Sequence, residues 1–448
     1  MIRKLLIANR GEIAVRIIRA CREMGIASVA VYSEADRDSL HTQLADEAIC
    51  IGPASSTDSY LNMERIIAAT EACHADAIHP GFGFLSENSR FAMLCERCNI
   101  NFIGPSSEVI SRMGNKSQAR NTMEDAGVPV VPGSKEPIYD WETGKALADE
   151  IGYPVIIKAV SGGGGKGMRE VFKPEDFEQQ FLTAQTESVR GFNDDAMYVE
   201  KFITRPRHVE FQILADQFGN VIHLGERDCS VQRKHQKMVE ESPCAAISPE
   251  LRAKMGETAV RAAKAAGYTS AGTIEFLLDT DNSFYFMEMN TRIQVEHPVT
   301  EMVTGIDLIQ QQIRIASGLP LDMTQEDVRL KGHAIECRIN AENPAKHFMP
   351  CPGTVTNVHF PGGNGVRVDS AVYNGYKIPP FYDSMILKLI VHAEDRTSAI
   401  NKMRSALGEL VLQGVTTNLD FQYELLNNPA FSSGNFDTHF IETYYPDL

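Results

Sequence analysis

Residues 272–296 contain two apolar runs, GTIEFLL and SFYFMEMN, separated by the short polar stretch DTDN. Runs rich in β-branched and aromatic residues on either side of such a stretch predict a β-hairpin. A turn centred on Asp281 and Asn282 would set Glu275 directly opposite Glu288. Like charges in that position destabilise a sheet unless a cation lies between them, and proteins hold magnesium with carboxylates, waters and substrate phosphates. The hairpin therefore predicts a site for magnesium and a nucleotide.

The second strand of this hairpin leads into polar residues at alternate positions. They are Glu288, Asn290, Arg292, Gln294 and Glu296. In an extended chain all five side chains point the same way. They would offer metal ligands, a guanidinium suited to a small planar anion, and a carboxylate that can act as a base. An ordinary half-buried strand with a solvated charged face is the simpler alternative, but Glu275 inside an apolar run argues against it.

Composition and charge limit the class of protein. The chain has 448 residues, enough for about three domains. We expect a cytoplasmic protein, because no apolar stretch approaches the ~20 residues that span a bilayer and the N-terminus lacks a signal-peptide pattern. Nine cysteines without framework spacing fit reduced thiols, and the C-x-x-C of Cys95 and Cys98 has no second pair nearby. A net charge of −16 argues against nucleic acid or an acidic membrane as the main partner.

Residues 1–115 alternate strand-like and helical runs, as in KLLIA followed by EIAVRIIRACREMG. This alternation predicts an open parallel α/β sheet. The first strand-to-helix turn, NRGE, is not a dinucleotide fingerprint, so we do not expect NAD binding. The stretch HPGFGFLSEN follows another strand, at the sheet edge where small ligands bind. From Gly332 onward the pattern turns toward β-strands, with helical segments near 397–410 and 417–427.

A strand ending in Lys158 leads into the glycine-rich stretch SGGGGKGM. Consecutive glycines let backbone N–H groups approach a polyphosphate. Lys166 is followed by Gly167 rather than by Ser or Thr, so the stretch is not a Walker loop. A flexible linker is the alternative, but strand patterns on both sides favour a phosphate-binding loop.

Together these motifs resemble a known family. Lys116, Lys158 with its glycine loop, EKFI, HQK and the paired glutamates resemble ATP-grasp enzymes, whose two lobes clamp ATP and magnesium. The stretches IANRGEIAVRIIRA, HPGFGFLSEN, KAVSGGGGKGM, ERDCSVQRKHQK, EMNTRIQVEHPVTE and GHAIECRINAE are similar to biotin carboxylase, in order and across essentially the whole chain. The resemblance implies an α/β and α+β fold in three parts. These are an N-terminal α/β domain (1–115), an ATP-grasp region (116–330) with a mobile lid at about 131–203, and a mixed β-rich C-terminal domain (331–448).

The resemblance implies an ATP-dependent ligase. Such enzymes use ATP to convert bicarbonate to carboxyphosphate, which yields carbon dioxide for the carboxylation of biotin N1 on a biotin carboxyl carrier protein. This is the first half-reaction of acetyl-CoA carboxylase, which leads to malonyl-CoA and fatty acids; a subunit of a pyruvate or other acyl-CoA carboxylase is the alternative. The implied cofactors are ATP, Mg2+ or Mn2+, and bicarbonate. The implied partners are the biotin carrier, carboxyltransferase subunits and a second copy of the chain in a homodimer.

The resemblance also implies roles for single residues. For ATP it implies Lys116, Lys158, Gly164, Gly165, Glu200, Lys201, Phe202, Ile203, His208, Gln232, His235, Glu275, Leu277 and Glu288. For the metal ion it implies Glu275, Glu288 and Asn290. For bicarbonate and biotin it implies Lys237, Arg292, Gln294, the backbone of Val295, and Arg338. Glu296 would be the base that deprotonates bicarbonate, and Arg338 would stabilise the biotin enolate.

One position departs from the family pattern. Phe82 stands where the family commonly has tyrosine, so a hydroxyl near biotin is lost. The absence of a Met-Lys-Met biotin-attachment sequence predicts a freestanding subunit whose carrier is another chain. Two rival hypotheses are an ATP-grasp ligase that activates another carboxylate for an amine or thiol, and a nucleotide-sensing subunit without catalysis. The row from Arg292 to Glu296 and Arg338 argue against the first, and the presence of every metal carboxylate and of the base argues against the second.

Overall fold

The computed structural model describes residues 2–160, 168–192 and 194–448. The chain divides into two compact units. The larger comprises Met1–Val128, Arg207–Leu277 and Glu288–Leu448, and the smaller comprises Pro129–Pro206 and Leu278–Met287. Among the described residues, no helix has both the length and the apolar character needed to cross a membrane.

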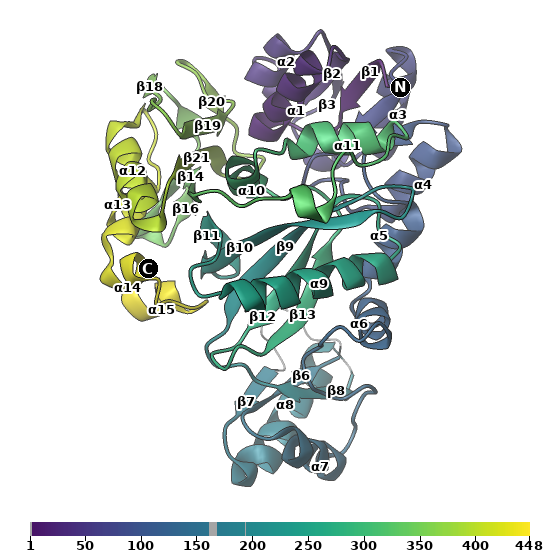
Figure 1. The fold of residues 1–448 in the computed structure, drawn as a ribbon, viewed down its shortest axis with the longest axis vertical. Coiled ribbons are helices and arrows are strands. Elements are labelled where there is room, and N and C mark those ends of the chain that lie inside the picture. Colours follow the sequence, from purple (N-terminus) through teal and green to yellow (C-terminus); the bar gives the residue numbers. More distant parts are fainter. Residues whose placement is uncertain (1, 161–167, 193) are drawn as a thin grey trace. The chain divides into compact units, whose positions relative to one another are not determined.

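The N-terminal part of the larger unit is the predicted open parallel sheet, with strand order β3-β2-β1-β4-β5. Figure 1 labels β1, β2 and β3 of this sheet. Its strands are β1 (Lys4–Ile7), β2 (Ala27–Ser33), β3 (Glu47–Gly52), β4 (Ala77–His79) and β5 (Asn101–Phe102). The helices of this part are α1 (Gly11–Glu23), α2 (Leu40–Leu44), α3 (Met63–Ala72), α4 (Ser89–Arg97), α5 (Ser107–Gly114) and α6 (Lys116–Asp125). Because strand side chains alternate, Leu5 and Ile7 pack with α1 on one face and Leu6 packs with α3 and α4 on the other.

One eight-stranded sheet, with order β13-β12-β9-β10-β11-β14-β21-β19, joins the central and C-terminal parts of the chain. Its strands are β9 (Arg207–Ala215), β10 (Val221–Arg233), β11 (Gln236–Ser242), β12 (Ser270–Leu278), β13 (Phe284–Asn290), β14 (His333–Asn340), β19 (Val366–Ser370) and β21 (Met385–Ala393). Helix α9 (Pro249–Ala265), capped by the Ser248 side chain, packs on β9 and β10. Helix α10 (His297–Thr304) packs on β14 and β21, and α11 (Leu308–Ala316) follows it.

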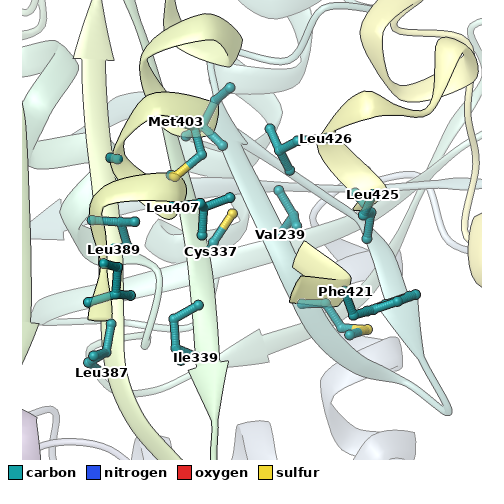
Figure 2. Close-up of a cluster of buried hydrophobic side chains, with 14 of the residues drawn as sticks. Val239, Cys337, Ile339, Leu387, Leu389, Met403, Leu407, Phe421, Leu425 and Leu426 are labelled. Atoms are coloured by element: carbon teal, nitrogen blue, oxygen red, sulfur yellow. The ribbon is translucent and has the colours of Figure 1, made fainter. Parts of the chain in front are cut away.

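The opposite face of β14 and β21 carries the C-terminal hydrophobic core. Figure 2 shows Val239, Cys337, Ile339, Leu387 and Leu389 of the sheet together with Met403 and Leu407 of α12 (Arg396–Glu409) and Phe421, Leu425 and Leu426 of α13 (Leu419–Asn427). Short strands pair outside the sheet as β15 (Glu342–Asn343) with β16 (Met349–Pro350), β17 (Gly353–Thr354) with β20 (Lys377–Ile378), and β18 (Asn357–His359) with β22 (Val411–Gln413). Helices α14 (Pro429–Ser433) and α15 (Phe440–Tyr444) end the chain.

Strands β12 and β13 form the predicted hairpin, but its turn differs. The N–H of Asp279 donates to the carbonyl of Ser283 at 2.8 Å, and the N–H of Asn282 donates to the carbonyl of Asp279 at 3.1 Å. The loop therefore has three residues and is not centred on Asp281 and Asn282 as predicted. Asn282 has a φ of 68°, a left-handed conformation that asparagine tolerates and that closes three-residue hairpin loops.

The smaller unit contains a three-stranded antiparallel sheet with order β7-β6-β8. Its elements are β6 (Val155–Ala159), β7 (Met168–Val171), β8 (Met197–Lys201), α7 (Trp141–Ile151) and α8 (Phe177–Phe192). Val155 and Ile157 of β6 pack with Phe177 and Phe181 of α8 to form its core. The predicted glycine loop, with Gly164 and Gly165, lies outside the described residues.

Candidate active site

The carboxylate of Glu296 lies within a buried group of charges in the larger unit. Its Oε1 accepts a hydrogen bond from Lys237 Nζ at 2.6 Å, and its Oε2 accepts one from Arg338 Nη2 at 3.0 Å. Burial opposes ionisation, but Lys237 and Arg338 outweigh it and hold the pKa of Glu296 well below its usual range. The residue predicted to be the base is therefore an ionised carboxylate held by two cations.

Lys237, on β11, reaches three carboxylates. Its Nζ lies 2.6 Å from Glu210 Oε2, 3.2 Å from Glu275 Oε1 and 2.6 Å from Glu296 Oε1. Glu210 also accepts a hydrogen bond from Nε of the fully buried Arg227 at 2.6 Å. Burial disfavours the ammonium, but the acidic groups around it raise the pKa of Lys237 well above its usual value. Lys237 thus keeps a positive charge that can bind an anion.

Glu275, one of the two carboxylates predicted to bind the metal, is held by polar side chains on both of its oxygens. Asn290 Nδ2 donates to Glu275 Oε1 at 2.7 Å, and His208 Nε2 lies 2.8 Å from Glu275 Oε2. Glu288 reaches solvent, yet its partial withdrawal from bulk water and the nearby Glu275 carboxylate raise its pKa. The two acids therefore interact electrostatically, and a divalent cation bound by both would offset their repulsion.

A second grouping of possible metal ligands consists of His208, Glu210 and Glu275, whose ligand atoms lie within 4.8 Å of one another. Glu210 already pairs with the ammonium of Lys237 and the guanidinium of Arg227. Cations of the protein therefore occupy both oxygens of Glu210. Glu275 also has partners on both of its oxygens, but Glu288 is exposed and has a raised pKa, so the set of Glu275, Glu288 and Asn290 keeps a carboxylate that a divalent cation can reach from solvent.

The segment after β13 is not the extended strand that the sequence predicted. Strand β13 ends at Asn290, and helix α10 begins at His297. The polar row nevertheless converges, because Arg292 donates to Gln294 Oε1 at 2.6 Å and to Asn290 Oδ1 at 3.1 Å, and Gln294 Nε2 donates to Glu275 Oε1 at 3.0 Å. Because the chain leaves the sheet here and soon enters a helix, these side chains meet at the site and do not lie in a row along a strand.

Glu87 fixes the guanidinium of Arg292 from the N-terminal part of the larger unit. Arg292 Nε donates to Glu87 Oε2 at 2.8 Å, and the N–H of Thr291 donates to Glu87 Oε1 at 3.0 Å. The loop that precedes Glu87 is tied down by Asn9, whose Nδ2 donates to the carbonyl of Phe82 at 2.7 Å. Glu87 belongs to the motif HPGFGFLSEN, which was predicted to lie at a ligand-binding edge, but no role was predicted for this glutamate.

Arg338, on β14, donates hydrogen bonds to two acids. Its Nε donates to Glu240 Oε1 at 2.5 Å and its Nη2 donates to Glu296 Oε2. Burial raises the pKa of Glu240 to about 7 against the opposing effect of Arg338. Glu240 stands directly opposite Glu336 in the β11–β14 ladder. Glu240 was not predicted, because the adjacent acids in KMVEES show no alternation that distinguishes a residue facing the site.

The hairpin of β10 and β11 presents Gln232 and His235. Gln232 pairs with Lys237 in the ladder, and the turn residues Lys234 and His235 have φ values of 49° and 64°. Two left-handed residues form the hairpin turn that best matches strand twist, and in residues other than glycine this conformation costs energy. Of the other predicted residues in the larger unit, Lys116 begins α6 and is exposed, while Leu277 and Val295 are half-buried.

The predicted residues of the smaller unit lie on and after β6 and β8. Lys158 Nζ donates to Glu200 Oε2 at 2.5 Å. Lys201 Nζ donates to the carbonyl of Gly152 at 2.9 Å, which holds its ammonium against the backbone. After β8, Phe202 packs edge-on against Phe172, and Ile203 is buried.

The chain is similar in sequence and in fold to several known proteins. Three protein-family models match: the biotin carboxylase N-terminal domain at residues 1–110, the carbamoyl-phosphate synthase L chain ATP-binding domain at 115–324, and the biotin carboxylase C-terminal domain at 336–443. Biotin carboxylase 1 of Bacillus subtilis is 59% identical over 445 residues and 99% of both chains. The Campylobacter jejuni biotin carboxylase in complex with beta-gamma-ATP is 52% identical, with a TM-score of 0.90 over 99% of both chains. The biotin carboxylase domain dimer of Hydrogenobacter thermophilus 2-oxoglutarate carboxylase, in complex with MgADP, ADP and bicarbonate, is 50% identical, with a TM-score of 0.89 over 99% of this chain and 98% of that one.

Proposed function

The chain belongs to the biotin carboxylase family, and we propose that it uses ATP and bicarbonate to carboxylate biotin carried on a separate protein. It is an ATP-dependent ligase. The observation that carries the proposal is the buried, ionised Glu296 between Lys237 and Arg338. A base, two cations and metal-binding carboxylates in one site are the groups that activation of bicarbonate by a nucleotide requires.

In the proposed bicarbonate site, Lys237, Arg292, Gln294 and the backbone of Val295 bind the anion. Lys237 now donates to Glu296 at 2.6 Å, so an incoming anion competes with Glu296 for it. Losing part of that bond raises the pKa of Glu296 as the substrate binds, which makes the carboxylate a better base. Glu296 then accepts the bicarbonate proton on a carboxylate oxygen.

Arg338 has the proposed task of stabilising the biotin enolate. Its guanidinium is held at two nitrogens by Glu240 and Glu296. A guanidinium fixed in this way needs little reorganisation when charge develops on a nearby oxygen.

Mg2+ or Mn2+ fits the oxygen ligands of Glu275, Glu288 and Asn290. The raised pKa of Glu288, caused first by burial and then by the Glu275 carboxylate, supports this assignment, because a bound cation would offset both effects. When bound, the metal ion would neutralise phosphate charge during phosphoryl transfer.

The proposed function includes binding of ATP, and the complex of the Campylobacter jejuni relative with beta-gamma-ATP supports this part of the proposal. The residues proposed for ATP are Lys116, Lys158, Glu200, Lys201, Phe202, Ile203, His208, Gln232, His235 and Leu277. The proposal also includes a lid at about 131–203 and the glycines Gly164 and Gly165, which lie outside the described residues. The domain division 1–115, 116–330 and 331–448 is supported by the three family matches.

The proposed setting is a cytoplasmic acetyl-CoA carboxylase, in which the chain acts as a homodimer with a biotin carboxyl carrier protein and carboxyltransferase subunits. The high identity to Biotin carboxylase 1 of Bacillus subtilis supports it, as does the dimer of the Hydrogenobacter thermophilus domain. The nine cysteines, all of them unpaired, fit a reducing compartment. The second candidate is the corresponding subunit of a pyruvate or other acyl-CoA carboxylase, because the Hydrogenobacter thermophilus relative belongs to a 2-oxoglutarate carboxylase.

The first test is ADP release by the purified chain with ATP and magnesium, with and without bicarbonate and free biotin. We expect cleavage of ATP that requires bicarbonate and is strongly stimulated by biotin. Turnover indifferent to biotin would retain a bicarbonate-dependent ligase and reject biotin as acceptor. Turnover without bicarbonate would reject the proposed chemistry.

A further inference from the structure

Lys388, on β21, is a fully buried lysine that the proposed chemistry does not use. Its side chain is 0% exposed. A lysine is rarely buried without strong compensation, because an ammonium loses several kcal/mol of hydration. Burial disfavours its charge, but nearby acids, with Glu12 first among them, outweigh burial and raise the pKa of Lys388. The group is therefore a charged donor inside the larger unit.

The shortest contact of Lys388 is with the backbone of the catalytic segment. Its Nζ donates to the carbonyl of Val295 at 2.8 Å. In the part of the chain that the structure describes, no backbone N–H bonds to this carbonyl. The segment lies between the end of β13 at Asn290 and the start of α10 at His297. The carbonyls of Gln294 and Glu296 accept backbone N–H groups of α10, but the carbonyl of Val295 between them has Lys388 as its donor.

The peptide group bound by Lys388 immediately precedes the side chain of the proposed base. The carbonyl of Val295 and the N–H of Glu296 belong to one planar peptide group. A donor fixed on the carbonyl therefore fixes the direction from which the Glu296 side chain leaves the backbone. It also fixes the Val295 backbone, which is assigned to bicarbonate.

Lys388 is held in turn by acids from two other elements. Its Nζ lies 3.3 Å from Glu12 Oε1 on α1 and 3.9 Å from Asp369 Oδ2 on β19. Asp369 has a second partner in Arg367, which donates to both of its carboxylate oxygens at 3.0 Å and 2.8 Å. Glu12 is the less compensated acid, because neither of its oxygens has a hydrogen-bond partner among the described residues and burial raises its pKa to about 7.

We propose that Lys388 is a positioning residue for the bicarbonate site, which holds the Val295–Glu296 peptide in its reactive orientation from the C-terminal part of the larger unit. This inference rests on the proposed function. Lys388 touches neither bicarbonate nor biotin and acts through the backbone alone. Loss of Lys388 should lower kcat and the apparent affinity for bicarbonate. The affinity for ATP should not change.

The decisive variant is Lys388→Met combined with Glu12→Gln. Methionine removes the donor to Val295, and glutamine removes the acid that would otherwise be buried without its cation, so the fold is not left with an unpaired charge. We expect kcat/KM for bicarbonate to fall roughly 10- to 100-fold, the range for a misplaced reacting group. The Kd for ATP should stay within about twofold of the wild-type value, since no contact of ATP is assigned to this network.

The matched control is Lys402→Met. Lys402, on α12, also donates its ammonium to backbone carbonyls, those of His392 at 2.6 Å and Asn364 at 3.0 Å, but these lie away from the site. The Lys402→Met variant should keep the wild-type kcat/KM for bicarbonate. Normal kinetics in a folded double variant, or an equal loss in Lys402→Met, would overturn the proposal.

Lys388→Arg decides the question if the double variant does not fold. Arginine keeps the charge beside Glu12 and Asp369 but is longer and planar, so it cannot place its donor as lysine does. A loss of several-fold in kcat/KM for bicarbonate is expected, and wild-type kinetics would overturn the proposal. The wild-type enzyme is assayed alongside: if it needs neither bicarbonate nor biotin, the proposed function fails, whereas the difference between the variants bears on Lys388.

Discussion

The two faces of the C-terminal half of the eight-stranded sheet are both buried, yet they are built from opposite kinds of residue. On one face, Cys337 of β14 and Leu389 of β21 pack beneath α12 and α13 (Figure 2). On the other face, toward α1 and α10, the same strands carry Glu336, Arg338 and Lys388. Because side chains alternate along a strand, an apolar residue and a charged one follow each other in sequence and end on opposite faces.

The difference between the faces separates stability from chemistry. Each large apolar side chain buried on the first face contributes about 1.5–3 kcal/mol. Each ion buried on the second face costs several kcal/mol of hydration, which its partners return only in part. The charged face is thus a poor source of stability, but its cations reach Glu296 and Val295. Changes to one face should therefore alter stability, and changes to the other should alter catalysis.

The largest expected effect is that of Glu296→Gln on the charged side. Glutamine keeps the volume of the side chain but cannot accept the bicarbonate proton. We expect kcat for bicarbonate-dependent ATP cleavage to fall by about 10²- to 10⁴-fold, while the Kd for ATP changes little. ADP release and equilibrium ATP binding measure the two quantities. An equal loss of ATP binding would contradict the assignment of Glu296 as the base.

The next effect is that of Leu389→Ala on the apolar face, and it should fall on stability. Leu389 is fully buried in the C-terminal core. Removing its side chain should lower the free energy of unfolding by about 2–5 kcal/mol, measured by urea denaturation. In the folded enzyme, kcat/KM for bicarbonate should stay at the wild-type value. The same substitution at the exposed Leu61 should cost less than about 1 kcal/mol. A bicarbonate defect in folded Leu389→Ala would show that the faces are not separate.

Residue patterns predicted most of the fold because sheets and helices repeat. The parallel N-terminal sheet, the β12–β13 hairpin and the strands on each side of the C-terminal core follow from alternation. Strand β3 was not predicted, because its run EAICIG is short and shows no alternation of polar and apolar residues. The predicted end of β13 was also wrong. Polar residues continue to alternate in the sequence as far as Glu296, although the chain leaves the sheet before that residue. The turn of the hairpin depended on the left-handed conformation of Asn282, which the sequence permits but does not require.

The site was predictable where its residues lie in motifs, and unpredictable where they meet across the fold. Glu275, Arg292 and Glu296 came from one hairpin and the segment after it, and the structure brings them together. Glu87 meets Arg292 across 205 residues of sequence, a contact that tertiary packing alone determines. The same holds for Lys388, which reads as an ordinary break in the apolar run SMILKLIVHAE. The roles assigned to single residues remain predictions.

Glu336→Gln tests whether the charged face is a cost to stability. Burial raises the pKa of Glu336 well above its usual range, so the native state keeps a proton that the unfolded chain releases. Wild-type stability is therefore lost as pH rises from the ordinary glutamate pKa toward the raised one. Glutamine has no such proton. From pH 5.5 to pH 7.5, the free energy of unfolding of Glu336→Gln minus that of the wild type should increase by up to about 2 kcal/mol. Urea denaturation at each pH measures this difference.

The control for this pH dependence is Glu424→Gln, which changes an exposed residue of α13. Its free energy of unfolding should run parallel to the wild-type value over the same pH range. The free energy of unfolding of Glu336→Gln could instead stay parallel to the wild-type value, or decrease relative to it as pH rises. Either result would mean that Glu336 is ionised in the native state and that the charged face stabilises the fold at neutral pH.

The smallest expected effect is that of Gln422→Met, which removes a polar tether on the apolar side. Gln422 is fully buried on α13, and its Nε2 donates to the carbonyls of Met238 at 3.0 Å and Arg338 at 2.9 Å. Methionine fills the same space without a donor, so we expect a loss of about 1 kcal/mol in the free energy of unfolding. Because those carbonyls belong to the strands that carry Lys237 and Arg338, kcat should also fall by a few fold. Leu389→Ala, with a larger loss of stability and unchanged kcat, is the comparison. If Gln422→Met likewise leaves kcat unchanged, the apolar face serves stability alone, and the site is positioned entirely from the charged side.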